Sequence, residues 1–187
     1  MKGRSIALGT FAGVHSGHIA IIGRALEAAK TNDLDPLIYT FSTHPMAAFG
    51  KCPPLLMTNE ARIAALSQFC AVAADDFTPV FAATEPRAFA EMLVARFRMR
   101  HAVAGYNYTF GHKGAGDTAL LQTLGAELGF SVEIVPPVLF EGEPLSSTRI
   151  RAALETGEVA KAAEMLGKPY SLTGTVAPNR GIGRSIG

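Results

Sequence analysis

The sequence contains only two cysteines, Cys52 and Cys70, and they form no Cys-x-x-Cys pair. This usage excludes a disulfide framework and favours reduced thiols in a cytoplasmic protein. Excess charge is also missing, because 17 Lys and Arg against 16 Asp and Glu leave a formal net charge of +1. A broad nucleic-acid-binding surface usually needs a clear basic excess, so nucleic acid is not an expected partner.

Long hydrophobic runs are absent as well. The longest apolar stretches, such as residues 69–74, are far shorter than the roughly 20 residues that span a bilayer, so no membrane association is expected. The basic N-terminus before an apolar run faintly resembles a signal peptide, but glycines interrupt the run and no cleavage site follows. Hydrophobic residues still make up 48% of the chain, which suits one packed domain and excludes disorder.

Predicted strands and helices alternate along the chain, which indicates an α/β fold with a parallel sheet covered on both faces. Strands are expected at residues 5–8, 37–41, 71–74, 78–81, 101–105 and 131–135. Helices are expected at residues 18–30, 58–69, 146–155 and 158–166. Two more are expected to begin after capping residues, one after Thr84 with Pro86 in its first turn and one after Asp117. Residues 170–176 alternate like a further, antiparallel strand.

Ligands in parallel sheets bind beyond the carboxyl ends of the strands. The loops after the first, second and fourth strands, and the loop before Ser146, are therefore expected to meet at one site. The Pro-rich loop at 42–57 is long enough to suggest a functional role.

The turn at residues 9–18, Gly-Thr-Phe-Ala-Gly-Val-His-Ser-Gly-His, is the first candidate site. Gly13 and Gly17 let the backbone approach a ligand closely, and the following helix N-terminus attracts anions. His15 and His18 lie three residues apart and can donate together to phosphate oxygens as charge builds on them. Helix capping is the alternative for these histidines, and metal binding is disfavoured because no third ligand lies nearby.

Three adjacent hydroxyl residues, Ser146, Ser147 and Thr148, open a late helix and precede Arg149 and Arg151. Such hydroxyls often only cap a helix. Cations near a helix N-terminus are disfavoured unless an anion lies between, and guanidinium groups suit phosphate oxygens, so this helix start is expected to bind a triphosphate. The sequence has neither a Walker phosphate loop nor the G-x-G-x-x-G dinucleotide pattern.

These motifs and two further segments resemble the FAD synthetase domain of bacterial bifunctional riboflavin kinase/FMN adenylyltransferases, in the HxGH nucleotidylyltransferase superfamily. The matching segments follow the family's order, and they are Gly9–His18, Thr40–Pro45, Gly105–Gly111 with Lys113–Asp117, and Leu145–Arg151. The resemblance implies a Rossmann-like α/β/α nucleotidylyltransferase domain over residues 1–168. Residues 169–187 would then be the truncated start of a riboflavin-kinase-like β-barrel or a tail, contributing a short C-terminal β segment.

The resemblance also implies a reaction, in which AMP passes from ATP to FMN to give FAD and pyrophosphate, with Mg²⁺ carried by ATP and no metal held by the protein. It implies catalytic roles for His15, His18 and Arg151. The implied ATP-binding residues are Gly9, Phe11, Gly13, Gly17, Ser146, Ser147 and Thr148. The implied flavin-binding residues are His44, Pro45, Phe49, Asn107 and Phe110. Alternatives stay open for His44, which can simply fix its loop, and for Phe49 and Phe110, which can be ordinary core or loop-anchoring aromatics.

Two features depart from the family pattern. Ala12 stands where the family has Asp, which leaves the catalytic efficiency and the substrate open. Residues 174–176 and 183–187 resemble the start of the kinase barrel, but the sequence ends before the barrel's Pro-Thr pair, so no riboflavin kinase activity is expected. Two other functions therefore remain open, namely a nucleotidylyltransferase with another phosphorylated acceptor and a weakened paralogue that only binds flavin or nucleotide. The oligomeric state is open too.

Overall fold

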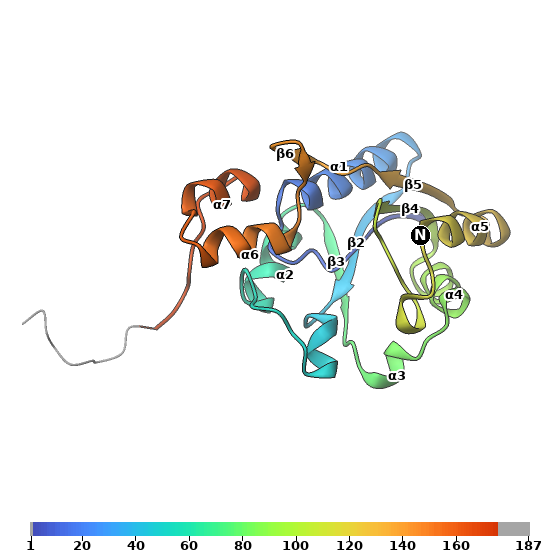
Figure 1. Cartoon of the computed structure of the whole chain (residues 1–187). Helices are drawn as coiled ribbons and strands as arrows, with labels where there is room; N and C mark the ends of the chain where they lie inside the picture. Colours follow the sequence, from blue (N-terminus) through green and yellow to red (C-terminus); the bar gives the residue numbers. More distant parts are fainter. Residues whose placement is uncertain (1, 176–187) are drawn as a thin grey trace, which may run out of the picture.

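The computed structural model describes residues 2–175. Within them, five strands form one parallel sheet in the order β3-β2-β1-β4-β5 (Figure 1). The strands are β1 (Arg4–Leu8), β2 (Asp35–Phe41), β3 (Ala71–Asp75), β4 (Met99–Gly105) and β5 (Ser131–Val135). The arrangement confirms the predicted α/β class with a parallel sheet.

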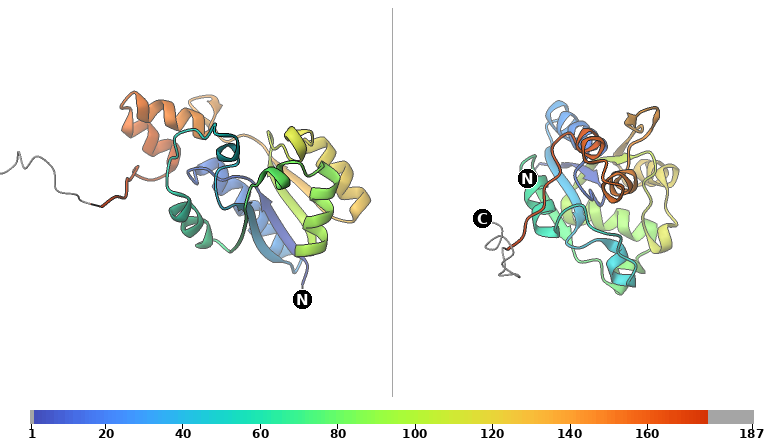
Figure 2. Two further views of the ribbon diagram at one scale, coloured as in Figure 1. Left: turned by 90° about the horizontal axis from the view of Figure 1, so that it is seen from below. Right: turned by 60° about the vertical axis from the view of Figure 1, so that its left-hand side comes forward.

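Helices cover both faces of this sheet, as the two views of Figure 2 show. Alternate residues of β1 face opposite ways. Ala7 packs with the face covered by α1 and α2, whereas Ile6 and Leu8 pack with the face covered by α4 and α5. The four helices are α1 (Ser16–Thr31), α2 (Asn59–Ser67), α4 (Pro86–Phe97) and α5 (Thr118–Leu128). None of the helices in residues 2–175 has both the length and the apolar character needed to cross a bilayer.

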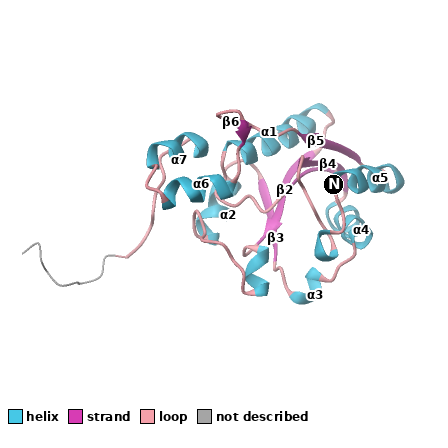
Figure 3. Cartoon of the chain, in the orientation of Figure 1, coloured by secondary structure: helices cyan, strands magenta, loops and turns pink. Residues whose placement is uncertain are grey.

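Two further helices, α6 (Ser147–Glu155) and α7 (Val159–Leu166), pack against each other to one side of the sheet (Figure 3). Their shared core contains Ile150 and Met165 and also Leu56 from the long loop after β2. Gly167 ends α7 in a left-handed conformation with φ 73°, as predicted from its place after the last apolar residue. The packing brings the start of α6 next to the loop that follows β2.

Two predictions about residues 78–86 are wrong. The predicted strand at 78–81 is the short helix α3 (Pro79–Ala82), because Pro79 has no N–H for a strand ladder and Thr78 caps the helix by accepting from Phe81 N at 3.1 Å. The cap of α4 is Glu85 rather than Thr84, because Pro86 occupies the first helical position and the cap directly precedes it.

The C-terminal β segment is not observed in the described part of the tail, residues 170–175, which form no strand. Residues 171–175 are exposed, and none of the described strands lies beside them to complete a ladder. Residue 176 and the kinase-like stretch at 183–187 lie outside the described residues. A short hairpin, β6 (Leu139–Phe140) and β7 (Glu143–Pro144), was not predicted.

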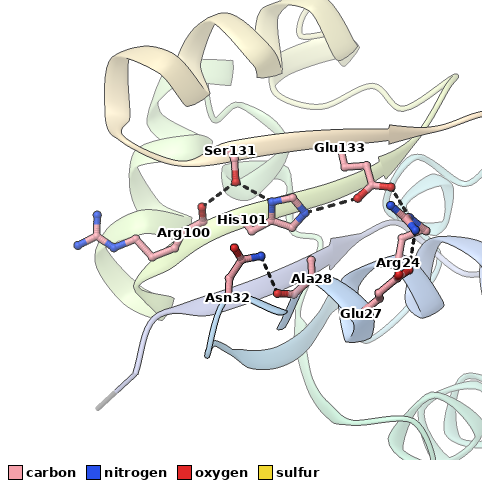
Figure 4. Close-up of polar contacts among 8 residues, drawn as sticks. All are labelled: Arg24, Glu27, Ala28, Asn32, Arg100, His101, Ser131 and Glu133. Carbon is pink, nitrogen blue, oxygen red and sulfur yellow. Dashed lines mark hydrogen bonds and ion pairs between the residues drawn. The ribbon is translucent and has the colours of Figure 1, made fainter. Parts of the chain in front are cut away.

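A polar cluster joins α1, β4 and β5 near the amino-terminal ends of these strands (Figure 4). His101 Nδ1 lies 2.7 Å from Ser131 Oγ, which donates to Arg100 O at 3.3 Å. The other ring nitrogen of His101 lies 3.8 Å from Glu133, which forms an ion pair with Arg24 of α1. Burial lowers the pKa of His101. The cluster fastens α1 to the β4–β5 side of the sheet.

Candidate active site

A cavity of about 920 Å³ opens at the carboxyl ends of the strands. Segments that follow all five sheet strands line it, because parallel strands end at the same edge of a sheet. The predicted contributors, namely the loops after β1, β2 and β4 and the loop before Ser146, are all present. The loop before Ser146 is the one that follows β5, and only the segment after β3, around Phe77–Thr84, was not predicted to contribute.

The turn after β1 is held in a strained backbone conformation. Phe11, Gly13 and Val14 have positive φ angles of 50°, 86° and 48°. This region is unfavourable for a β-branched residue such as Val14, and such strain persists only where the surroundings fix it. Phe11 and Val14 are both buried in the core between the sheet and α1. The core therefore holds the start of α1 in one geometry at the cavity.

His15 and His18 form a stacked pair in this turn, with ring centroids 3.7 Å apart and an interplanar angle of 17°. His15 is the N-cap residue of α1, but its side chain makes no capping hydrogen bond. The Nδ1 atoms of both rings are buried and have no hydrogen-bond partner among the described residues. A capping role for the imidazoles is therefore not observed, and both residues line the cavity.

Burial keeps this pair neutral. It lowers the pKa of His15 to about 4. Burial is also the main cause that lowers the pKa of His18 well below its usual value, with further contributions from the charges of His15 and Arg62. Near pH 7 each ring therefore offers one N–H donor and one lone pair.

The start of α6 forms the opposite side of this end of the cavity. Ser146 caps α6 by accepting from Arg149 N at 3.3 Å, and Ser147 Oγ donates to Ala12 O at 2.6 Å. Both serines line the cavity. The bond to Ala12 links α6 to the turn after β1, so two helix N-termini approach the same space, and neither has an acidic residue in its first turn.

The two arginines of α6 bind backbone oxygens. Arg149 donates to three carbonyl groups of the β6–β7 hairpin, including Glu143 O at 2.9 Å. Arg151 Nε donates to Pro54 O at 2.7 Å. Neither side chain is among the residues that line the cavity. They hold the hairpin and the 42–57 loop against α6.

Aromatic side chains form the other end of the cavity, and we call this group the aromatic wall. Successive rings are in contact, with centroids 4.9 Å apart for Phe41 and Phe77 and 5.7 Å apart for Phe89 and Phe110. The members of the aromatic wall that line the cavity are Tyr39, Phe41, Phe49, Phe77, Phe81, Phe89, Tyr108 and Phe110. Such a surface suits a flat apolar ring system.

No Asp or Glu is among the described residues that line the cavity. Lys51, Lys113 and His112 line it in addition to the histidine pair. Within residues 2–175 no group of three or more His, Cys, Asp or Glu side chains is arranged to hold a metal ion. The cavity is therefore suited to an anionic ligand and has no carboxylate to repel one.

Most of the predicted site residues lie together at this cavity. Those that line it are Gly9, Phe11, His15, Gly17, His18, Pro45, Phe49, Asn107, Phe110, Ser146 and Ser147. Gly13 and His44 instead line a small neighbouring cavity of about 10 Å³, and His44 Nδ1 accepts from Met46 N at 3.2 Å. Thr148 is exposed in the first turn of α6, and Arg151 contacts the 42–57 loop.

Sequence reasoning missed several members of the aromatic wall and the buried Arg62 beside the turn. Phe77 and Phe81 follow β3, so the rule that strand ends meet at one edge would have identified them. Arg62 lies one helical turn before Leu66 in α2, and both are buried. That i, i+4 spacing was a signal that Arg62 faces the core.

Comparisons with known proteins identify the family of the chain. Residues 1–149 match the FAD synthetase family. The chain is 33% identical over 187 residues to a bifunctional riboflavin kinase/FMN adenylyltransferase of Listeria monocytogenes, covering 97% of this chain and 59% of that protein. It is 30% identical over 192 residues to the protein of the same name from Escherichia coli K12, covering 100% of this chain and 61% of that protein. The chain thus spans about three fifths of the length of these curated relatives.

Two solved structures are also similar. A Streptococcus pneumoniae protein described as a macrolide-efflux protein matches with a TM-score of 0.86 and 29% identity, covering 100% of this chain and 62% of that one. A pantoate-beta-alanine ligase from Francisella tularensis, solved with an ATP analogue and beta-alanine, matches with a TM-score of 0.51 and 14% identity, over 86% of this chain and 69% of that one. This second likeness concerns the fold alone. The match over residues 1–149 covers most of the sequence, so the chain belongs to the FAD synthetase family.

Proposed function

We propose that this chain transfers AMP from ATP to FMN, forming FAD and pyrophosphate. One observation carries the proposal. A single cavity joins an anion-binding end, made by two helix N-termini and the His15–His18 pair, to an aromatic end, with no carboxylate among its described lining residues. Its volume of about 920 Å³ is near the upper end of the range for small-molecule sites, which suits two ligands that meet end to end.

In the proposed reaction an oxygen of the FMN phosphate attacks the α-phosphorus of ATP. The new P–O bond forms while the bond to the bridging oxygen breaks, and pyrophosphate leaves with that electron pair. His15, His18 and the N–H groups at the starts of α1 and α6 stabilise the charge that develops on the α-phosphate. The FMN phosphate is already a nucleophile, so catalysis consists of positioning and charge stabilisation, with Gly9, Phe11, Gly17, Ser146 and Ser147 shaping the phosphate end.

Phosphate binding also favours protonation of the two neutral histidines. A nearby anion favours the imidazolium form and opposes the effect of burial on the pKa values of His15 and His18. We propose that Gly13 supports the same turn from behind. Thr148 and Arg151 complete the phosphate contacts if Arg151 leaves Pro54 when ATP binds.

Magnesium belongs to this reaction as part of the MgATP substrate. The described lining residues include no carboxylate, so the donor set does not fit a resident Mg²⁺ ion. When bound to the triphosphate, the ion neutralises part of its charge. The flavin then lies along the aromatic wall, with Pro45, Phe49, Asn107 and Phe110 beside it and His44 behind the loop.

The test is to incubate the chain with ATP, MgCl₂ and FMN and to separate the flavins by chromatography while pyrophosphate is assayed in parallel. Equal amounts of FAD and pyrophosphate are expected. The matched control is the double variant His15→Ala, His18→Ala, which is expected to lose activity. FAD at or below the level of this control would reject the proposal. Measuring AMP transfer to a panel of other phosphorylated acceptors then shows whether FMN or another compound is the acceptor.

A second candidate is a protein that binds flavin and nucleotide without turnover. The observation in its favour is Ala12, which bonds to Ser147 through its backbone oxygen but offers no carboxylate. Calorimetry with ATP and with FMN, on the chain as it stands and on Ala12→Asp, separates the two. Binding without FAD formation in both forms supports the binder, whereas a large gain of activity in Ala12→Asp supports a weakened enzyme.

We also propose that residues 1–168 form the adenylyltransferase unit, which the packing of α7 and the Gly167 cap support. The second unit at 169–187 stays a prediction. Both cysteines are free thiols, which supports a reducing, cytoplasmic setting.

A further inference from the structure

Arg62 is a buried guanidinium group in α2, with 5% of its surface exposed. Within residues 2–175, its side chain is in none of the ion pairs with Asp or Glu. A buried charge is costly unless hydrogen bonds and an opposite charge compensate it. Hydrogen bonds satisfy the guanidinium group, but no carboxylate of the described residues compensates its charge.

The hydrogen bonds of Arg62 join two segments of the cavity wall. Nη1 donates to Thr10 O and to Thr40 Oγ1, both at 3.0 Å. Nη2 donates to Phe41 O at 2.5 Å and to Ser42 O at 3.3 Å. Thr10 belongs to the turn after β1, and the other three acceptors are at the end of β2, where the 42–57 loop begins. The planar fork of Arg62 thus fixes these two segments relative to each other.

Arg62 holds these two segments together without lining the main cavity itself. Thr10 and Phe41 line the main cavity, whereas Arg62 lines only the small neighbouring cavity that also contains His44. Its charge nevertheless reaches the site. Burial is the main cause that lowers the pKa of His18 and His44, the charge of His15 or Arg151 follows, and the charge of Arg62 lowers the pKa of both further. The groups that face the guanidinium are carbonyl oxygens, a hydroxyl and neutral imidazoles.

We propose that Arg62 is a positioning residue for both substrates. Its fork sets the spacing between the phosphate-binding turn after β1 and the flavin-binding loop after β2, and its buried positive charge behind that turn favours binding of the substrates' phosphate groups. This inference rests on the proposed adenylyl transfer. It adds a residue that contacts neither substrate and acts through Thr10, Phe41 and Ser42.

Two variants separate the effect of the Arg62 charge from the effect of its planar set of hydrogen-bond donors. Arg62→Lys keeps the charge but cannot reach four acceptors in a plane, and Arg62→Met removes both. Arg87→Met is the matched control, because Arg87 is a surface arginine of α4 that pairs with Glu91 and Glu127. Thermal midpoints are measured for all three, and Arg62→Lys carries the test if Arg62→Met does not fold.

The expected results differ between the two variants. Arg62→Lys should lower kcat by about tenfold to a hundredfold because the two segments lose their alignment, while inorganic pyrophosphate binds nearly as in the unaltered chain. Arg62→Met should also weaken pyrophosphate binding by at least about tenfold. By NMR titration, the pKa of His18 should rise in Arg62→Met and stay low in Arg62→Lys, which a merely structural role would not produce.

The inference is overturned if Arg62→Lys retains the unaltered kcat, or if a folded Arg62→Met binds pyrophosphate as the unaltered chain does. Failure of the proposed function is a separate result. If the unaltered chain forms no FAD, the adenylyl transfer is rejected, while pyrophosphate binding and the titration of His18 still test the charge of Arg62.

Discussion

Lowering the pH should destabilise the folded chain through His15. Burial lowers the pKa of His15 to about 4 in the folded state, against 6.5 in the unfolded chain. Between these values the unfolded state binds more protons, so the free energy of unfolding falls as the pH falls from 6.5 toward 4. His15 alone should cost about 2 kcal/mol at pH 5 and about 3 kcal/mol at pH 4, relative to pH 7.5.

The assay compares urea unfolding at pH 7.5 and pH 5.0 in phosphate-free buffers, because phosphate bound at the site would favour the charged imidazole. The sequence contains no tryptophan, so far-UV circular dichroism is the suitable signal. His15→Asn removes the titrating group, and its loss of stability between the two pH values should be smaller than that of the unaltered chain by about 2 kcal/mol. Its removal also relieves the repulsion that lowers the pKa of His18, which acts in the same direction.

Ser16→Ala is the matched control, because Ser16 belongs to the same turn and does not titrate. It should shift the free energy of unfolding equally at both pH values. The reasoning is refuted if His15→Asn and the unaltered chain lose the same stability between pH 7.5 and 5.0. That outcome would mean that the folded chain accommodates a proton on His15 without cost.

Four further substitutions test the fold. Gly23→Ala should raise the free energy of unfolding by about 0.5–1 kcal/mol, because Gly23 is exposed within α1 and an added Cβ would meet nothing within 4 Å; urea unfolding measures this. Gly111→Ala should cost more than about 2 kcal/mol, because Gly111 has φ 74° and the Cβ would lie 2.7 Å from the backbone nitrogen of Pro86. Gly114→Ala, at φ 68° but without such a backbone clash, should cost only about 1 kcal/mol by the same measurement. Leu93→Ala removes a fully buried side chain between α4 and the sheet and should cost about 3 kcal/mol, seen as a lower thermal midpoint.

The sheet and its covering helices could be predicted because their signals are local. Apolar runs such as residues 101–105 and helical spacing such as that of Phe89 and Leu93 reflect burial directly. The β6–β7 hairpin was not predicted because each of its strands has only two residues, too few to show an alternating pattern. The turn between them, at Glu141 and Gly142 with φ 54° and 80°, was the one sequence feature that could have indicated a hairpin, because two-residue hairpin turns need positive φ angles and favour Gly.

The end of the site that contains the histidine pair was easier to predict than the aromatic end. His15, His18, Ser146 and Ser147 stand in short segments whose residue types already indicate anion binding. The aromatic wall arises only when loops from different strands meet, and its members resemble core residues in the sequence. Phe77 illustrates this, because its place at the cavity depends on the pairing of β2 with β3.

The arginines of α6 show where an argument from charge alone was incomplete. Arg149 and Arg151 near a helix N-terminus suggested an anion between them, but carbonyl oxygens of the hairpin and of Pro54 satisfy their donors in this structure. Several carbonyl oxygens can accept all the hydrogen bonds that a guanidinium group donates, just as a phosphate can. Unlike a phosphate, they do not neutralise its charge. The positive groups at or near the cavity are therefore the two helix N-termini, the lysines that line it and Arg62, which lines the small neighbouring cavity. Because Arg62 is buried and fixed by four hydrogen bonds, its charge is in place before any substrate arrives, whereas Arg151 can contribute only after it releases the 42–57 loop.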